Sequence, residues 1–411
     1  MKVAVVGGGI AGIAAAHKLS EKHDVTLFEA SETLGGHAHS ETIRVENRLL
    51  TVDTAFLIFN MRTYPLFCAF LEELGVAEKI MPAEMSSCFY SDDLCYSLGL
   101  PQQPLKASLG HFFRLDFLSI FIDLLRFRRR AASDYKNLSD RSALWECSVS
   151  DYLSRYGEPF CRNFAYPLMA AIWSLPVADV ENHPVASILN YFGNHSLLEG
   201  KSDRKWNTFV GSSQIYLDAF TKSFRGKIRL ANTVKRIIRT AEHCQLIGEM
   251  DDVALYDRVV IATHADTALA LLDSPTDAEK NALSVWKYRC QPVTLHRDAS
   301  VLHRNRKYWA SWNMLRINNE YRISYYLNRL QNLPVETPVI LSLGEQGINQ
   351  GLIYSSFRYH HPVFDQRSVA SQRLLNGLNN GKTAFCGSYF GHGFHEDAFK
   401  SGVEAAASIV R

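Results

Sequence analysis

A strand, a glycine-rich turn and a helix open this chain, and an acidic residue ends the strand that follows. The two strands read Val3-Ala4-Val5-Val6 and Val25-Thr26-Leu27-Phe28-Glu29, with Gly7-Gly8-Gly9-Ile10-Ala11-Gly12 between them. In such a βαβ unit the first glycine permits a tight turn, the second lets the backbone approach a pyrophosphate, and the third lets the helix pack on the strand. The acid follows at the expected spacing of about 20 residues. This order predicts a bound dinucleotide.

Each part of this unit has an expected task. The helix N-terminus offers free N–H groups and a positive dipole end to phosphates. Glu29 would accept hydrogen bonds from the ribose hydroxyls of the adenosine half. We therefore expect cofactor contacts from Gly7, Gly9, Ile10, Ala11, Gly12 and Glu29.

A second glycine pair follows the acid, in Ala30-Ser31-Glu32-Thr33-Leu34-Gly35-Gly36-His37. Gly-Gly is also a common turn signal in ordinary loops. In this position, however, it resembles the pair of the flavin-containing amine oxidase and phytoene desaturase superfamily, which crosses under FAD. The resemblance implies that the cofactor is FAD and that Ala30, Gly35, Gly36 and His37 contact it.

Composition bounds the remaining classes. A chain of 411 residues that is 47% hydrophobic suits a large two-domain enzyme, and a net charge of +2 gives no general attraction for nucleic acid. The eight cysteines show neither a CxxC pair nor metal-like clustering, which is typical of reduced thiols in a cytosolic protein. We expect no metal site, no nucleic-acid partner and, without an uninterrupted apolar run of about 18 residues, no transmembrane helix.

The chain divides into two interleaved domains. We expect an α/β fold in which a Rossmann-like FAD domain, of the glutathione-reductase and amine-oxidase type, takes residues 1–75, 201–275 and 376–411. Residues 76–200 and 276–375 are rich in aromatics and carry no phosphate loop, so they are expected to form an α+β substrate domain. We expect mainly helices in its first part, and a sheet over the flavin in its second part, where residues 321–327 alternate between polar and apolar.

Two later segments complete the expected cofactor site. In the superfamily, the equivalent of Val234 touches the adenine through its backbone, and the turn at Ala262 closes that end of the site. Near the C-terminus, a short strand leads into a helix whose N–H groups would face the flavin's N1/O2 edge. We expect contacts there from Gly387, Ser388, Glu396, Asp397 and Ala398, although Glu396 and Asp397 also suit simple helix capping.

The segment from Phe112 to Arg130 is strongly amphipathic. On a helix, a narrow polar stripe separates large apolar residues, and arginines close the end; the stripe comprises Asp116, Ser119, Asp123, Arg126 and Arg130. Such a helix suits a bilayer interface. It equally suits a buried helix whose polar stripe faces solvent, and the sequence favours this second interpretation slightly.

Longer motifs bring the resemblance below the superfamily level. The chain is similar to a bacterial family of FAD-dependent oxidoreductases, often encoded beside cyclopropane-fatty-acid-synthase-like methyltransferases, in Gly35–His39, Val52–Asn60, Arg62–Pro65, Trp309–Asn313, Leu327–Gln331, His361–Asp365 and Gly393–Asp397. This resemblance implies action on unsaturated or methylated acyl chains of membrane lipids. Relatives commonly have Gly-Gly-Ser where this chain has Gly211-Ser212-Ser213, and we expect Ser212 to form the turn if its φ stays negative.

Several side chains are candidates for the layer that faces the flavin. Histidines can move protons near neutral pH, although each is more often a hydrogen-bonded scaffold residue. We expect the catalytic role from His395 first, His37 second and Tyr64 third, with Phe56 as a cofactor contact. Amine oxidases of the superfamily often carry a lysine on the strand after the adenine end, and Lys287 is its rough counterpart here. They also carry two aromatic rings that flank the amine, for which Tyr389 and Phe390 lie near the right position. The further candidates are His39, Phe59, Asn60, Trp312, Asn313 and His392.

Three hypotheses stay open at this stage. The first is an FAD-dependent desaturase or isomerase of lipid acyl chains, which takes hydride at flavin N5. The second is an amine or polyamine oxidase that releases hydrogen peroxide, and the third is a catalytically silent FAD-bound partner of a lipid methyltransferase. We expect a cytoplasmic protein with a lipid or other apolar substrate, peripheral on the inner face of the membrane if residues 112–130 contact the bilayer.

Overall fold

The computed structural model describes residues 1–410 except 92–93, 101–102, 108, 140–141, 174, 195–196, 199–204, 251, 318–319, 346 and 380. Its cofactor-side sheet has five parallel strands in the order β11-β2-β1-β15-β21. These strands come from distant parts of the chain: β1 Lys2–Val6, β2 Asp24–Phe28, β11 Lys227–Arg229, β15 Arg258–Ile261 and β21 Thr383–Phe385. The expected βαβ unit forms the centre of this sheet.

Both faces of the parallel sheet are covered, as its near-continuous apolar strands require. Val3 and Val5 pack on one face with helices α1 (Ile10–Ser20), α2 (Pro65–Glu73), α9 (Gln214–Ser223) and α14 (His395–Ile409). Ala4 and Val6 pack on the other face with β12 (Val234–Arg239), β13 (Cys244–Gly248), β14 (Val253–Tyr256), α10 (Ala265–Leu271), α11 (Asp277–Leu283) and α13 (Gln366–Leu378).

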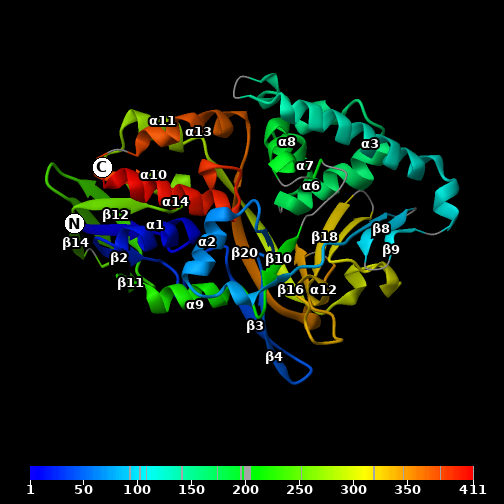
Figure 1. Ribbon diagram of the computed structural model, residues 1–411, viewed down its shortest axis with the longest axis horizontal. Helices are drawn as coiled ribbons and strands as arrows, with labels where there is room; N and C mark the ends of the chain where they lie inside the picture. The colour runs from blue at the N-terminus through cyan, green and yellow to red at the C-terminus, as the bar shows by residue number, and fades with distance from the viewer. Residues whose placement is uncertain are drawn as a thin grey trace.

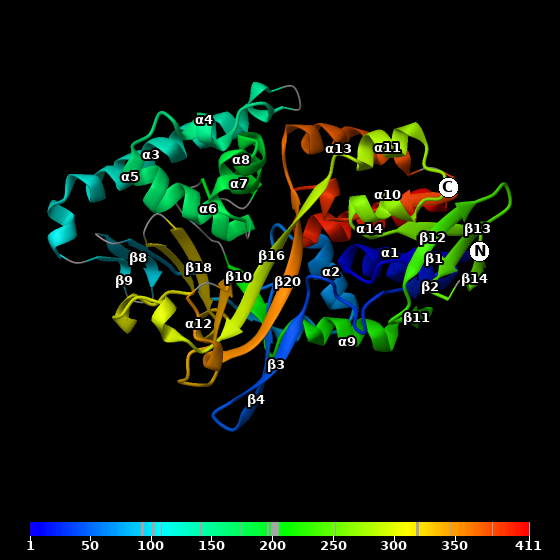
Figure 2. The same cartoon turned by 180° about the vertical axis from the view of Figure 1, so that it is seen from behind.

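A second sheet of eight strands, in the order β20-β16-β19-β18-β17-β7-β8-β9, builds the other half of the molecule. Its strands are β7 Ser87–Ser91, β8 Cys95–Leu100, β9 Gln103–Ala107, β16 Lys287–His296, β17 Trp312–Ile317, β18 Glu320–Tyr326, β19 Ile340–Leu343 and β20 Ile353–Val363. The long pair β16 and β20 runs from this half toward the cofactor side (Figures 1 and 2). The expectation of mainly helices in 76–200 is wrong for its first part, because β7, β8 and β9 extend the sheet as an antiparallel meander.

Helices cover this sheet around the largest apolar cluster of the described residues. They are α3 Leu115–Lys136, α4 Val149–Leu153, α5 Glu158–Phe160, α6 Tyr166–Trp173, α7 Val177–Glu181 and α8 Val185–Asn194, with a π-helical turn at Cys161–Ala165. Smaller elements complete the fold: the β3 (Ser40–Val45) and β4 (Arg48–Asp53) hairpin, a sheet of β5 (Phe59–Asn60), β10 (Trp206–Phe209) and β6 (Ile80–Pro82), and α12 (Leu327–Leu330).

The structure therefore has a mixed α/β fold built from interleaved segments. The domain limits given above stay a prediction, and the limit at 200/201 falls within 199–204, outside the described residues. Within the described part of the chain, no helix is both long and apolar enough to cross a membrane.

Helix α3 forms where the sequence predicts it, but with a different orientation. Asp123, in the middle of the polar stripe, is only 5% exposed. Its Oδ2 accepts a hydrogen bond of 2.8 Å from the backbone N–H of Gly157, at the start of α5. The interpretation in which the polar stripe faces solvent therefore fails at Asp123, which satisfies a helix N-terminus in the interior, whereas Arg126 and Arg130 of the same stripe are exposed.

Candidate functional site

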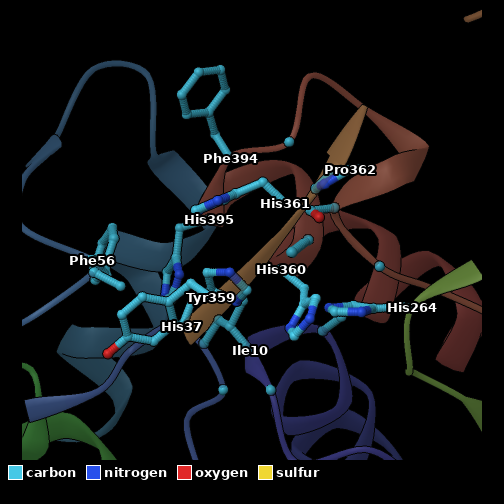
Figure 3. A pocket seen from close by; sticks show the side chains of 18 of the residues that line it. Ile10, His37, Phe56, His264, Tyr359, His360, His361, Pro362, Phe394 and His395 are labelled. Carbon is cyan, nitrogen blue, oxygen red and sulfur yellow. The ribbon is translucent and has the colours of Figure 1, made fainter. Parts of the chain in front are cut away.

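A cavity of about 630 Å³ runs between the two halves of the molecule. It begins between the carboxyl ends of β1, β2 and β15 and continues beneath the eight-stranded sheet. Figure 3 shows His37, Phe56, Tyr359 and His395 on one side of this space and His264 on the other. In parallel α/β sheets, the carboxyl ends of the strands are the usual place for a ligand.

The N-terminus of α1 opens into this cavity. Its N-cap residue is Gly9, which has no side chain to cap the first N–H groups of the helix. Gly7 has a φ of +109°, which favours glycine. A Cβ added to Gly9 would meet no atom within 4 Å, so its Hα side is free for a ligand. Ile10 and Ala11 also line the cavity. This geometry offers free N–H groups and close backbone approach to a phosphate.

Gly12 does not line the cavity, which corrects its expected place among the cofactor contacts. A Cβ there would lie 1.9 Å from the carbonyl oxygen of Gly7. Its role is the tight packing of α1 on the first turn, as the fingerprint also predicts.

The expected ribose end is also assembled. The Glu29 carboxylate accepts hydrogen bonds from the N–H groups of Gly8 (2.6 Å) and Ser31 (2.8 Å), which fixes it beside the glycine turn. Ala30, Val234 and Ala262 line the same end of the cavity. A fixed carboxylate with remaining lone pairs is suited to accept sugar hydroxyls.

The second glycine pair lies directly on the first turn. The N–H of Gly35 donates to the carbonyl of Gly8 at 2.9 Å, and Gly35 and Gly36 have positive φ values of +119° and +59°. Gly36 approaches Gly9 so closely that an added Cβ would lie 3.3 Å from its Cα. Gly36 therefore lets the two glycine turns approach each other, and Gly35 is required because an added Cβ would lie 2.3 Å from the carbonyl oxygen of Ala38.

Histidines surround the middle of the cavity, and sequence reasoning missed most of them. The ring of His37 lies 5.0 Å from that of His361 and 6.4 Å from that of His264. The Nε2 of His37 and the Nδ1 of His361 are buried without a hydrogen-bond partner among the described residues. Burial lowers the pKa of His37 well below its usual value and that of His361 to about 4. The rings are therefore neutral near pH 7, with two nitrogens available to a ligand.

His395, the first catalytic candidate, is held in an aromatic stack. Its ring lies 3.8 Å from that of Phe56 with an interplanar angle of 10°, and Phe67 meets it edge-on. The Nε2 of His395 lies 3.2 Å from the Tyr216 hydroxyl. Burial lowers the pKa of His395 to about 3, so the ring is neutral and already partnered. Tyr64 lines the cavity too, and burial raises its pKa well above the usual value.

Glu396 and Asp397 are not among the residues that line the cavity, and their expected N–H contacts with the flavin edge stay a prediction. Glu396 accepts hydrogen bonds from the N–H groups of Leu66 and Phe67, at the start of α2. Asp397 Oδ2 accepts hydrogen bonds from the backbone N–H groups of His392 and Phe394, at the start of α14. Both carboxylates thus cap helix N-termini, the alternative that the sequence left open. Gly387, Ser388 and Ala398 do line the cavity.

The rough amine-oxidase counterparts are only partly present at the cavity. Lys287 is exposed at the start of β16 and does not line it; of the two aromatic residues, Tyr389 lines it and Phe390 does not. Ser212 has a φ of +131°, so the expectation of a negative φ is wrong. Ser212 is buried beside Ser213, whose N–H and hydroxyl donate to the Asp53 carboxylate, and this anchoring holds the strained turn.

The far part of the cavity is an apolar chamber. Helices α6 and α8 contribute Trp173 and Tyr191, and the eight-stranded sheet contributes Trp312, Tyr325 and Leu341. Trp312 and Tyr325 meet edge-on at 5.2 Å between ring centroids. Among the described residues that line the cavity, Glu29 is the one acidic side chain, and none is lysine or arginine. The chamber is therefore suited to a neutral, apolar group.

Taken together, these residues fit a dinucleotide attached to a flat ring system. The glycine turn and the N-terminus of α1 suit a pyrophosphate, Glu29 a ribose, and the partnerless nitrogens of His37 and His361 can donate to or accept from the polar edge of the group.

Comparisons with known proteins agree with this architecture. Residues 5–74 match the family model described as NAD(P)-binding Rossmann-like domain. No curated protein matches the chain. Three solved structures share its fold over 98–99% of its length at 13–14% identity: a candidate protoporphyrinogen oxidase from Exiguobacterium sp. 255-15, a fatty acid isomerase producing CLA from P. acnes, and cyclohexylamine oxidase from Brevibacterium oxydans IH-35A. Their TM-scores are 0.68, 0.69 and 0.69, and 98%, 96% and 98% of their own chains are covered.

Proposed function

We propose that this chain is an FAD-dependent oxidoreductase that acts on unsaturated or methylated fatty acyl chains, by dehydrogenation or isomerisation. One observation carries the proposal. A single cavity joins the N-terminus of α1 to an apolar chamber. Among the described residues that line this cavity, Glu29 is the one with a charged side chain, and it lies at the opposite, ribose end. An acyl chain has no charge to pair, so burial of its methylene groups supplies the binding energy, about 0.8 kcal/mol for each.

The residues that would hold FAD are those at the glycine turns. The N-terminus of α1 and Gly9 would hold its pyrophosphate, Glu29 its adenosine ribose, and Gly36 and His37 the stretch toward the flavin. FAD supplies a hydride acceptor at N5 when bound. The protein itself must place the acyl carbon, exclude water and hold a proton.

His37 suits the proton-holding role better than His395. The Nε2 of His37 has no partner among the described residues, whereas that of His395 faces the Tyr216 hydroxyl. Both rings are neutral, since burial lowers both pKa values. We therefore propose that His37 accepts or returns a proton at Nε2, and that His395 supports the cavity wall through its stack on Phe56.

The shared fold also fits the other proposal, an amine oxidase. No described carboxylate lies in the chamber to pair with a second ammonium group. A polyamine is therefore the less suitable substrate, and a small monoamine is the form of this alternative that the cavity accommodates.

The test is an anaerobic spectrum of the purified flavoprotein. Vesicles that contain unsaturated or mid-chain-methylated phospholipids are added in one series, and a panel of monoamines and polyamines in another. Bleaching of the flavin band near 450 nm, roughly where free flavin absorbs, by lipid alone supports the desaturase. Unbleached flavin with a shifted double bond in the recovered lipid supports the isomerase. Bleaching by amines alone, or unchanged lipid and flavin in both series, overturns the acyl-chain proposal.

A further inference from the structure

The outward face of α3 carries a regular row of large apolar side chains. Leu115, Leu118, Ile122 and Leu125 follow one another at spacings of three and four residues, which places them on one side of the helix. Leu115 is 84% exposed, Ile122 58% and Leu125 55%. Phe113, just before the helix, is 86% exposed. We call this row with Phe113 the α3 face.

The charges around the α3 face are mainly positive. Arg129 continues the row by one more helical turn and is exposed, and Arg126 and Arg130 lie beside it. The helix's three carboxylates are all engaged: Asp116 pairs with Arg114 at 2.7 Å, the buried Asp123 pairs with Arg126 at 2.8 Å, and Asp134 pairs with Arg130 at 2.8 Å, so Arg129 is the arginine of this group without a carboxylate partner among the described residues of the helix. The row itself carries no acidic side chain. An apolar surface with a cationic end complements an anionic lipid surface.

The α3 face lies at an outer edge of the molecule. In both ribbon views, α3 is at the end opposite the two termini, outside the layer that contains α6 and α8 (Figures 1 and 2). Its inner side, with Phe117, Ile120 and Phe127, belongs to the same apolar core as Tyr191 of α8, which also lines the cavity. One helical layer therefore separates this exposed surface from the apolar chamber.

We infer that the α3 face docks on an anionic membrane surface, with its apolar row inserted among the lipid chains and its arginines on the headgroup phosphates. Such docking brings the chamber close to membrane acyl chains. This last link rests on the proposed function, whereas the membrane contact itself does not depend on the reaction.

The experiment compares matched variants of the full chain by co-sedimentation with vesicles of phosphatidylglycerol and phosphatidylcholine. Ile122→Ser/Leu125→Ser removes half of the row, and we expect binding to fall about 10-fold or more. Arg129→Gln should weaken it about 5-fold, since one charge near an anionic surface contributes about that factor. Val253→Ser/Leu255→Ser changes two similarly exposed residues on β14 and should bind as the wild type does.

Several outcomes would overturn the inference. They are wild-type binding by the Ile122→Ser/Leu125→Ser variant, equal loss in the β14 control, and equal binding to vesicles of phosphatidylcholine alone. Sedimentation velocity without lipid tests the rival occupant: self-association that the α3 variant abolishes, together with no vesicle binding, would assign the face to a second copy. Because the assay measures partitioning and not redox chemistry, failure of the acyl-chain reaction leaves its result unchanged.

Discussion

Gly9→Ala should stabilise the cofactor-free protein and weaken its binding of FAD. Gly9 has φ −71° and ψ 175°, a conformation that alanine adopts freely, and an added Cβ meets no atom within 4 Å. Under these conditions a glycine-to-alanine change stabilises a fold by about 0.4–1 kcal/mol, because the unfolded chain loses freedom. The new methyl group would occupy the space assigned to the pyrophosphate, so we expect affinity for FAD to fall by about 10-fold or more, roughly 1.4 kcal/mol.

The two effects have opposite signs, and they are measured separately. Urea unfolding of apoprotein gives the stability change, and flavin fluorescence titration gives the dissociation constant. Gly12→Ala is the contrasting variant: its Cβ would lie 1.9 Å from the Gly7 carbonyl oxygen, so the fold itself should be destabilised. Unchanged FAD affinity in Gly9→Ala would refute the placement of the pyrophosphate at the N-terminus of α1.

Three further predictions follow from single side chains. Burial raises the pKa of Asp53 to about 6, so its contribution to stability is present below its unfolded pKa of about 4 and is lost as the pH rises through 6. The unfolding free energy of Asp53→Asn, measured in urea, should therefore rise by about 2 kcal/mol relative to that of the wild type as the pH increases from about 4 to 7. A difference between the two proteins that does not change with pH would contradict the raised pKa. Ser212→Gly should relieve the strain of the positive φ and raise the unfolding free energy by about 1 kcal/mol, whereas a loss of stability would show that the Ser212 side chain matters more than its backbone. Glu29→Gln replaces one carboxylate oxygen with an N–H₂ group, which faces one of the two backbone N–H donors that the carboxylate now binds. FAD affinity should therefore fall about 10-fold in the fluorescence titration. Wild-type affinity would exclude Glu29 from the ribose site.

The cofactor half of the site was predictable because its signals are local. The turn at Gly7, the acid at Glu29 and the pair at Gly35 and Gly36 lie within one short stretch. Backbone geometry demands the glycines, and the ribose hydroxyls of a dinucleotide demand the acid. Val234 and Ala262 were placed by their strands and by resemblance, and the structure brings both to the cavity.

The middle of the site was not predictable in the same way. His264 and His361 meet His37 only through the packing of β20 and the loop after β15, and nothing in their local sequence reveals this contact. The available signal was the family motif that begins at His361, and it did not place this residue in the site. The partner of Glu396 is likewise not visible in the sequence: its carboxylate accepts hydrogen bonds from the N-terminus of α2, more than 300 positions earlier in the chain.

The orientation of α3 was missed for a similar reason. Periodicity identifies two sides of a helix, but it does not tell which side finds a partner. Besides Arg126 on the same helix, Asp123 accepts a hydrogen bond from the backbone N–H of Gly157, 34 positions further along the chain. Because that contact depends on the tertiary arrangement, the apolar row became the exposed side.

A crystal structure of the FAD-loaded protein with a bound unsaturated fatty acid tests the central claim most directly. The account predicts the adenosine ribose at Glu29, the pyrophosphate at the N-terminus of α1, and the acyl chain in the chamber between Trp173 and Leu341. An acyl chain bound outside that chamber, or a dinucleotide whose phosphates lie away from Gly9, would contradict it.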